Sequence, residues 1–173
     1  PRFSPDGAYV ALSRPTGPEP GFNPDAPFVV PVAGGETSLA TPDIDRDLSG
    51  TWMPDARSLI ASGSDLTRVS LWLQPIGGDP RKLDLGAVNP SSAITVGANG
   101  SLAFTGAEPQ HPEELFYMAS VDSSPKRLTS LNSELASRRL GAVESISWEG
   151  PDGFKENGVL IFPPDFTVGK KYP

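Results

Sequence analysis

The chain has 173 residues and a net charge of −7, and it contains 20 prolines, 18 glycines and no cysteine. The negative charge argues against nucleic acid or an anionic membrane as a partner, since both bind basic surfaces. The missing cysteines exclude a disulfide framework and thiol chemistry. No apolar run approaches the roughly 20 residues of a membrane span. Prolines and glycines are scattered between short apolar runs, which predicts a turn-rich fold rather than disorder.

The first element along the chain is a turn that repeats. Phe3–Ala11 reads FSPDGAYVA, a Pro-Asp-Gly turn followed by a β-prone run, and Trp52–Ala61 is a second copy, with 49 residues from Asp6 to Asp55. A weaker third copy, Val96–Phe104, follows 44 residues after the second. An internal repeat of this length is typical of solenoids and propellers.

Two further elements repeat in step with the turn. Phe28–Gly35 matches Leu71–Gly78 at an offset of 43 residues, and Leu115–Met118 follows Leu71 by 44. Asp79–Leu83 and Ser124–Leu128 share a Pro-basic-basic-Leu pattern and lie 45 residues apart. Three elements that keep one spacing indicate a repeating structural unit.

A unit of about 44 residues with several short strands suits a propeller blade of four antiparallel strands. The apolar runs are short and β-prone, and no 3.6-residue stripe is sustained. The sequence therefore predicts an all-β fold, a partial β-propeller of about three four-stranded antiparallel blades plus a C-terminal β-hairpin. We expect repeats near 1–48, 49–92 and 93–140, with 141–173 as the hairpin segment that leaves the propeller.

The turn residues have a physical role in this prediction. Asp6 and Asp55 can accept hydrogen bonds from nearby backbone amides in an Asx-turn, and Gly7 can adopt a positive φ at little cost. Trp52 and Trp72 stand at repeat positions, so we expect both to lie in the core between blades.

Two segments depart from the repeat. Arg14–Pro27 holds five prolines, and since proline lacks an amide donor we expect a long loop between two strands of the first unit. Asn132–Arg139 is a possible helical turn.

The motifs resemble a known family. The Phe-Ser-Pro-Asp-Gly turn with its strand, and the strand closed by Gly-Gly, resemble blades of prolyl oligopeptidase-type serine peptidases and of TolB-like propellers. The C-terminal third is similar to the last blade and exit of the acylaminoacyl and dipeptidyl aminopeptidase branch. The segments that carry this second likeness are Pro112–Phe116, Arg127–Asn132, Leu140–Glu144, Ile146–Gly153, Pro163–Phe166 and Lys170–Pro173.

The resemblance implies that 141–173 leads into an α/β-hydrolase domain that lies beyond this chain. It also implies a parent serine exopeptidase or oligopeptidase that releases dipeptides or acylated amino acids from short peptides, with the propeller limiting access of substrate. The expected partners are a peptide substrate and the hydrolase domain in cis, and the open blade ends suggest self-association. No cofactor is implied. The alternative is a TolB-like propeller that binds proteins as a scaffold and has no hydrolase domain.

The chain itself lacks the residues of a serine peptidase. An α/β-hydrolase carries its nucleophile in a G-x-S-x-G turn, and no G-x-S occurs here. His111 is the one histidine, and we place it in a loop between blade strands, facing solvent. We therefore predict no catalytic residue in this chain and no hydrolysis by the chain alone.

Acidic residues suggest two other sites. Asp43, Asp45 and Asp47 resemble the start of a calcium loop, but an EF-hand needs glycine at its sixth position and glutamate at its twelfth, and the sequence has neither. Their alternation is more typical of a strand with an acidic face in water. Glu113-Glu114 could hold a substrate's amino terminus, as a glutamate pair does in dipeptidyl peptidases, but its position favours a structural role.

The remaining features also have simple structural explanations. Arg138-Arg139 and Lys126-Arg127 are most simply solvated pairs, with a substrate carboxylate contact as the alternative. Asn99-Gly100-Ser101 fits a glycosylation acceptor, yet it also falls at the expected third turn. We predict no metal site and no cofactor site.

Overall fold

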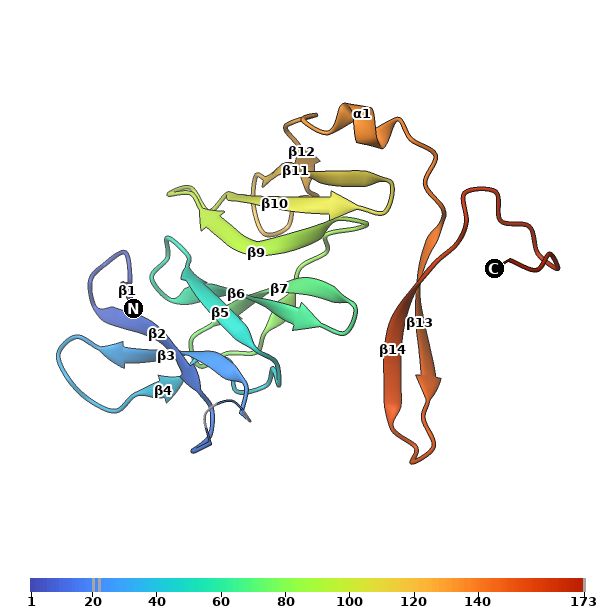
Figure 1. Ribbon diagram of the computed structural model, residues 1–173. Helices are drawn as coiled ribbons and strands as arrows, with labels where there is room; N and C mark the ends of the chain where they lie inside the picture. The colour runs from blue at the N-terminus through green and yellow to red at the C-terminus, as the bar shows by residue number, and fades with distance from the viewer. Residues whose placement is uncertain (20, 22, 173) are drawn as a thin grey trace.

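The computed structural model describes residues 1–19, 21 and 23–172, and across them the chain forms three four-stranded antiparallel sheets and a two-stranded sheet (Figure 1). The first sheet contains β1 (Arg2–Phe3), β2 (Tyr9–Pro15), β3 (Asp25–Pro31) and β4 (Ser38–Leu39). The second contains β5 (Leu48–Trp52), β6 (Ser58–Asp65), β7 (Arg68–Pro75) and β8 (Arg81–Lys82). The third contains β9 (Asn89–Val96), β10 (Leu102–Glu108), β11 (His111–Met118) and β12 (Lys126–Arg127). The short helix α1 (Ser133–Ala136) and the hairpin β13 (Val143–Glu149) and β14 (Lys155–Ile161) follow.

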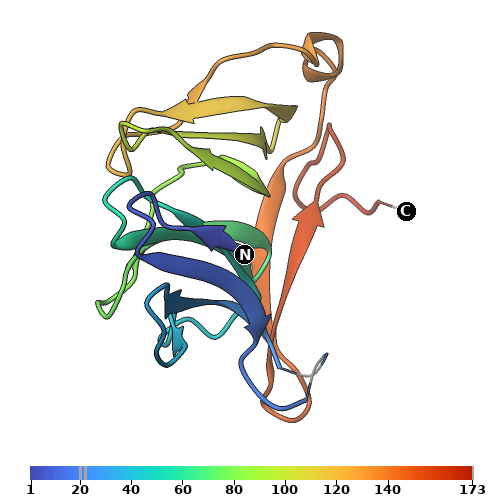
Figure 2. The same cartoon turned by 90° about the vertical axis from the view of Figure 1, so that its left-hand side faces the viewer.

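Each four-stranded sheet is a meander, with its strands hydrogen-bonded in chain order. The three sheets stack face to face as successive layers, and the β13–β14 hairpin runs along one side of the stack (Figure 2). This confirms the predicted all-β fold and partial propeller, with each sheet as one blade, called blades 1, 2 and 3 below. The helix α1 is far too short to cross a membrane, and the described residues contain no helix long and apolar enough to do so.

Apolar residues gather at the two joints between blades. The joint between blades 1 and 2 buries Ala11, Val29, Ala40, Trp52 and Leu59. The joint between blades 2 and 3 is larger and buries Met53, Ile60, Leu71, Leu83, Leu85, Val88, Leu102, Phe104, Phe116 and Met118. Burial of such area is the main force that holds one blade to the next.

The two repeat-position tryptophans lie on the face of blade 2 that is turned toward blade 1. Trp52 packs in the joint, and its indole N–H donates to the carbonyl of Arg2 in blade 1 at 3.1 Å. Trp72 packs with Leu48 and Ala61, and Ile44 from the connection between the two blades covers this group.

The three repeated turns have the predicted geometry. The Asp6 carboxylate accepts the Ala8 amide at 3.0 Å, and Gly7 has a φ of 72°. The Ser4 hydroxyl, followed by the Ala8 amide, lowers the pKa of Asp6 below its ordinary value by donating to the carboxylate.

The later copies keep this geometry with other residues. Asp55 accepts the amides of Arg57 and Ser58, both at 2.9 Å, and Ala56 takes the left-handed φ of 54° that glycine takes in the first copy. In the third copy Asn99 accepts the Ser101 amide at 3.2 Å. The Asx-turn therefore depends on local hydrogen bonds, and its geometry is retained when asparagine replaces aspartate or alanine replaces glycine.

One repeat match was wrong by one residue. The pairs Tyr9 with Pro31 and Ser58 with Pro75 give an offset of 44 between β3 and β7, not 43. Phe28 therefore corresponds to Trp72 rather than to Leu71. The difference matters because a shift of one residue moves a side chain to the opposite face of the sheet.

The predicted loop Arg14–Pro27 was too long. Strand β2 continues to Pro15 and β3 begins at Asp25, so the connection covers residues 16–24; Pro20 and Phe22 of this stretch, and Pro173, lie outside the described residues. Pro27 is accepted within β3 because its carbonyl receives the Ala40 amide at 2.9 Å. Its nitrogen faces the same side, toward the short strand β4, so the missing amide removes only one hydrogen bond between the two strands.

Gly63 should be required for the close approach of β6 to the start of β5 in blade 2. It lies in β6 opposite Leu48, and a Cβ atom there would overlap the carbonyl oxygen of Asp47. We predict that Gly63→Ala lowers the free energy of unfolding by about 1–3 kcal/mol, as overpacking does elsewhere, measured by urea unfolding. Ser64→Ala, the exposed neighbour, should stay within about 0.5 kcal/mol. Equal urea midpoints for Gly63→Ala and the unchanged protein would contradict this packing.

Candidate functional site

The hairpin β13–β14 stands beside the end of the blades where strands two and three of each blade are joined (Figure 1). In blade 2 this connection reaches the hairpin, with the Thr67 and Ser145 hydroxyls 2.9 Å apart. In blade 3 the side-chain amide of Gln110 donates to the carbonyl of Gly141 at 2.9 Å. These hydrogen bonds orient the hairpin against the propeller face.

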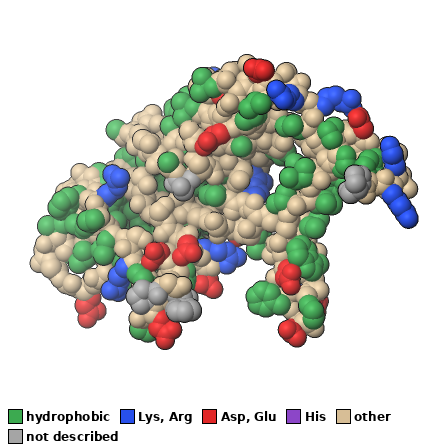
Figure 3. Space-filling view, in the orientation of Figure 1, with side chains coloured by type: hydrophobic (Ala, Val, Ile, Leu, Met, Phe, Trp, Pro, Cys, Tyr) green, Lys and Arg blue, Asp and Glu red, His purple; other side chains and the backbone are tan. Residues whose placement is uncertain are grey.

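The hairpin exposes apolar side chains on both of its faces. Its regular register pairs Val143 with Ile161 and Glu149 with Lys155, and residues alternate between the two sides. The exposed apolar residues of the hairpin and its turn are Val143, Ile146, Trp148, Phe154, Val159, Leu160 and Ile161. The space-filling view shows hydrophobic side chains along this projecting segment (Figure 3). A two-stranded sheet with little burial is marginally stable by itself.

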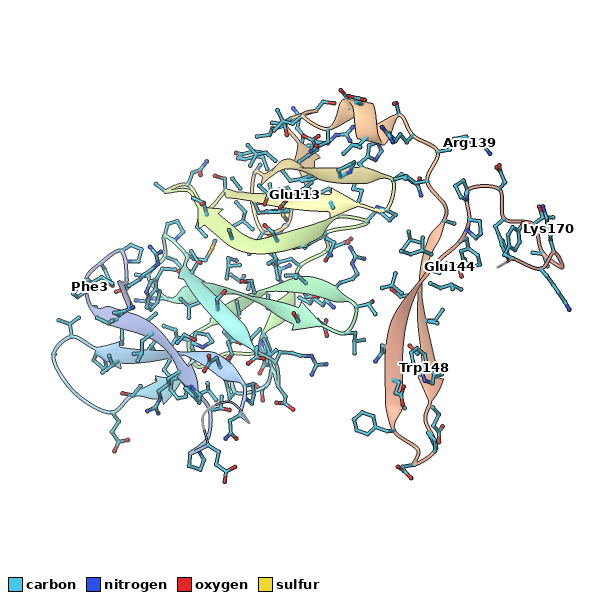
Figure 4. The ribbon with its side chains drawn as sticks, viewed as in Figure 1. Phe3, Glu113, Arg139, Glu144, Trp148 and Lys170 are labelled. Atoms are coloured by element: carbon cyan, nitrogen blue, oxygen red, sulfur yellow. The ribbon has the colours of Figure 1, made fainter. Side chains whose placement is uncertain are left out.

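One face of the hairpin is organised by an aromatic contact. Trp148 lies over Gly158 of the neighbouring strand, so that a Cβ atom at Gly158 would lie 3.1 Å from the indole ring. Ile146 and Leu160 share this face by alternation and are 39% and 40% exposed. The face therefore presents a preformed apolar patch, which Glu144 and Glu156 flank by the same register, with Trp148 projecting from the strand in Figure 4.

The segment after the hairpin folds back on its base. Arg139 pairs with Asp165, and the Phe166 ring centroid lies 4.5 Å from that of Phe162 and 5.4 Å from that of Tyr172. The Tyr172 hydroxyl donates to the Asp165 carbonyl at 3.0 Å. The end of the described chain is thus held next to the point where the hairpin begins.

Glu114 fixes the chain as it leaves blade 3. Its buried carboxylate accepts the Thr129 hydroxyl at 2.5 Å, the Leu131 amide at 2.9 Å and the Asn132 amide at 2.8 Å. These donors, the Thr129 hydroxyl first, hold the pKa of the Glu114 carboxyl below its ordinary value. The carboxylate also satisfies amides at the start of α1 that have no partner within the helix.

The two glutamates of Glu113-Glu114 do not form a paired site. Glu113, labelled in Figure 4, is exposed on the other face of β11 and accepts the Thr105 hydroxyl at 2.6 Å. Alternation along the strand sends the two carboxylates to opposite sides of the sheet. The role of Glu114 as a clamp was missed from the sequence, since its partners lie 15–18 residues further along the chain.

His111 is the first residue of β11, so its placement in a loop was wrong. A tight turn joins Glu108 to His111, which are partners in the ladder, and the His111 Nδ1 atom lies 3.7 Å from the Glu108 carboxylate. Arg127 approaches the same carboxylate at 3.9 Å. His111 borders an open pocket of about 280 Å³ with Ser130, Ser133 and Ser137. Among the described residues no hydrogen bond joins His111 to a serine hydroxyl.

The Asp43–Asp47 segment is a loop between β4 and β5, and its prediction as a strand was wrong. The backbone turns there, with the Ile44 amide donating to the Thr41 carbonyl at 3.3 Å. Asp47 is used structurally, because its carboxylate accepts the Asp25 amide at 2.8 Å. Residues 1–19, 21 and 23–172 contain no group of three or more metal-ligating side chains.

The basic pairs and the possible glycosylation site occupy ordinary structural positions. Lys126 and Arg127 form β12, at the outer edge of blade 3. The amide of Arg138 donates to the Leu135 carbonyl at 3.1 Å, at the end of α1. Asn99 lies in the third Asx-turn, where its side-chain oxygen also accepts the Ser101 hydroxyl at 2.7 Å.

No protein-family model and no curated protein sequence matches this chain. Several solved structures do. AtxE2 isopeptidase with astexin3-dC4 bound superposes with a TM-score of 0.76 at 17% identity, over 96% of this chain and 26% of that one. Puromycin hydrolase in complex with PGG gives 0.53 at 15% identity, over 100% of this chain and 35% of that one. A putative TolB from Agrobacterium tumefaciens gives 0.38 at 16% identity, over 93% and 73%.

These likenesses support the fold. At such low sequence identity, the superpositions indicate a shared backbone arrangement and not a shared activity. The TolB superposition is too poor to support an argument. The chain spans about a quarter of the isopeptidase chain. The matched portions of both enzymes share the backbone arrangement of the blades described above.

The Glu114 clamp predicts a pH-dependent exit segment. A carboxyl with a lowered folded pKa stabilises the structure fully above the ordinary glutamate pKa of about 4.3, and this stabilisation is lost as the pH falls through the lower folded pKa. Hydrogen-exchange protection of the Leu131 and Asn132 amides, measured by NMR, should fall over that window. Glu114→Gln should abolish this pH dependence and lower the protection already at neutral pH.

Glu113→Gln is the matched control, since it changes the neighbouring carboxyl on the opposite face. It should leave the protection of Leu131 and Asn132 and its pH dependence unchanged. Equal effects of the two substitutions would show that Glu114 does not clamp the segment.

Proposed function

We propose that this chain is the propeller portion and first hairpin of a serine peptidase of the prolyl oligopeptidase family. The observation that carries the proposal is the β13–β14 hairpin, which projects beside the propeller with apolar side chains on both faces. A two-stranded sheet with exposed apolar side chains on both faces needs another layer of secondary structure packed against it. An α/β-hydrolase domain that continues the hairpin would supply that layer.

The comparisons support this proposal at the level of architecture. Two hydrolytic enzymes, an isopeptidase and puromycin hydrolase, contain the arrangement of this chain within a polypeptide about three to four times as long. In the isopeptidase the likeness covers nearly all of this chain. The hairpin is therefore part of the likeness together with the blades.

In the proposed enzyme, the blades act by controlling access. The connections between strands two and three of each blade face the hairpin, and the longest of them, residues 16–24, lies in blade 1. Loops held on a rigid sheet scaffold at such an end are suited to contact substrate. Short peptides would reach the active site past this face, and larger ones would be excluded.

Catalysis in the proposed enzyme takes place outside this chain. Acyl transfer requires a nucleophile, a base and an orienting carboxylate held together, and residues 1–173 carry no G-x-S motif and one histidine. That histidine lies beside Glu108, which Arg127 also approaches, at the end of blade 3 where β10 turns into β11. The products would be dipeptides or acylated amino acids released from short peptides.

A propeller that serves as a protein-binding scaffold is the alternative function. Such a scaffold needs the blades but gives no physical reason for a projecting apolar hairpin. The hairpin therefore favours the peptidase, and the test below separates the two.

The test uses the complete reading frame that encodes these residues. The encoded protein should react with a fluorophosphonate probe, which labels activated serines, while residues 1–173 expressed alone should stay unlabelled. Peptides with free and with acetylated amino termini, analysed by mass spectrometry, would then show which product is released. A reading frame that ends close to residue 173, or a full-length protein that is not labelled and cleaves no peptide, would favour the scaffold and overturn the proposal.

A further inference from the structure

Equivalent turns of blades 2 and 3 hold the hairpin. A two-residue turn joins β6 to β7, and another joins β10 to β11; the second residue of the turn is Thr67 in blade 2 and Gln110 in blade 3. Both turns lie at the end of the blades that faces the hairpin (Figure 1). The Thr67 hydroxyl lies 2.9 Å from the Ser145 hydroxyl, and the Gln110 amide donates to the Gly141 carbonyl at 2.9 Å. The same position of the repeat therefore contacts the hairpin segment from two successive blades.

The two contacts meet one short stretch of chain. Gly141 lies just before β13, and Ser145 lies within that strand. Across the described part of the chain, these are the two hydrogen bonds that join the segment 141–161 to a blade. The direction in which the hairpin leaves the propeller is therefore fixed by two points on the same passage of the backbone.

Gly141 extends the contact with Gln110 to both ends of the hairpin. A Cβ atom on Gly141 would overlap the carbonyl oxygen of Phe162, so the chain that enters the hairpin crosses the chain that leaves it with the two backbones in contact. The Phe162 amide donates to the Ala142 carbonyl at 2.9 Å, which ties the two passages together. The Gln110 side chain therefore holds the entrance and the exit of the hairpin at one place.

The turn of blade 2 holds Thr67 in a fixed position. Leu66 has a φ of 59°, a left-handed conformation that is costly for leucine and that glycine or asparagine usually adopts in two-residue turns. On the other side of Thr67, the Arg68 guanidinium donates to the carbonyls of Gly86 at 3.0 Å and Val88 at 2.8 Å. Backbone strain of this kind persists where the surrounding structure enforces it, commonly at functional positions. Presentation of Thr67 to the hairpin supplies a reason for it here.

We propose that Thr67 and Gln110 are positioning residues that dock the hairpin at the angle which limits the access of substrate in the proposed enzyme. This inference rests on the proposed function, in which the hairpin begins the hydrolase domain. A domain attached through the hairpin takes its orientation from the two contacts, because both lie where the hairpin meets the blades. Loss of either contact lets the domain tilt away from the blades, and the wider gap then admits longer peptides. Neither side chain takes part in the chemical step.

The first test traps the docked hairpin by a disulfide in the protein encoded by the complete reading frame. Residues 1–173 contribute no cysteine of their own, and the Thr67 and Ser145 side chains are already in contact. The pair Thr67→Cys and Ser145→Cys should therefore form a disulfide on mild oxidation, identified by peptide mass spectrometry.

The pair Thr67→Cys and Ser147→Cys is the matched control for the trap. Ser147 lies two residues, about 7 Å, further along the strand, and its hydroxyl donates to Asn157 within the hairpin. This pair should stay reduced under the same conditions. Equal disulfide yields from the two pairs would overturn the inference.

The second test measures how the length of a peptide affects its cleavage by the complete protein. A short peptide is compared with the same peptide extended at its carboxyl end. Gln110→Glu removes the amide donor and Thr67→Val removes the hydroxyl, each with little change of shape. Each variant should raise kcat/KM for the long peptide by about fivefold relative to the short one, the population shift expected from the loss of one hydrogen bond. The kcat for the short peptide should stay unchanged, and Thr67→Ser, which keeps the hydroxyl, should behave as the unchanged protein.

Ser145→Ala and Ser147→Ala form a matched pair of variants on the hairpin. Thermal unfolding of each variant checks that the fold is retained. Ser145→Ala should change the length dependence, and Ser147→Ala should not. Combining Thr67→Val with Ser145→Ala should add nothing to either change alone, because both remove the same hydrogen bond.

The outcomes separate this inference from the proposed function. An unchanged length dependence in Thr67→Val and Gln110→Glu, in a protein that the fluorophosphonate probe labels, would overturn the inference and leave the proposed function standing. A complete protein that the probe does not label and that cleaves no peptide would overturn the proposed function, and this inference with it.

Discussion

The structure depends on the burial of one apolar sheet face against the next. A blade has two such faces, and the middle blade has both covered, so that Leu59, Ile60 and Leu71 are at most 1% exposed. The outer blades have one covered face each, which leaves Phe3 and Leu115 in solvent. Because each joint uses the same pair of faces, stability grows by the addition of neighbours, as in other repeat proteins.

The two ends of each blade are built differently. At one end, Asx-turns around Asp6, Asp55 and Asn99 close the first two strands through hydrogen bonds within a few residues. At the other end, connections of unequal length face the hairpin, and contacts over long sequence separations hold it there. Thr67 meets Ser145 across 78 residues, and the Glu114 clamp fixes the start of the exit segment. A rigid scaffold with one variable end is the usual setting for a binding or catalytic function.

The sequence predicted what local chemistry determines. The Pro-Asp-Gly turn specifies its own geometry, so the repeat, the all-β fold and the blades could be predicted from it. The register between β3 and β7 could not, because Phe28 and Leu71 look alike in sequence and the ladder alone assigns Phe28 to Trp72. Glu114 was not recognised as a clamp because its donors come from a distant segment that only the folded blade brings close.

The central claim is that the blades are stabilised by packing against each other, whereas the apolar side chains of the hairpin are exposed. Hydrogen–deuterium exchange on residues 1–173, followed by mass spectrometry, tests it most directly, because protection reports local opening. The account predicts strong protection in β6, β7 and β10, which lie at the joints, and fast exchange throughout β13 and β14. Protection of the hairpin equal to that of β6 would contradict it.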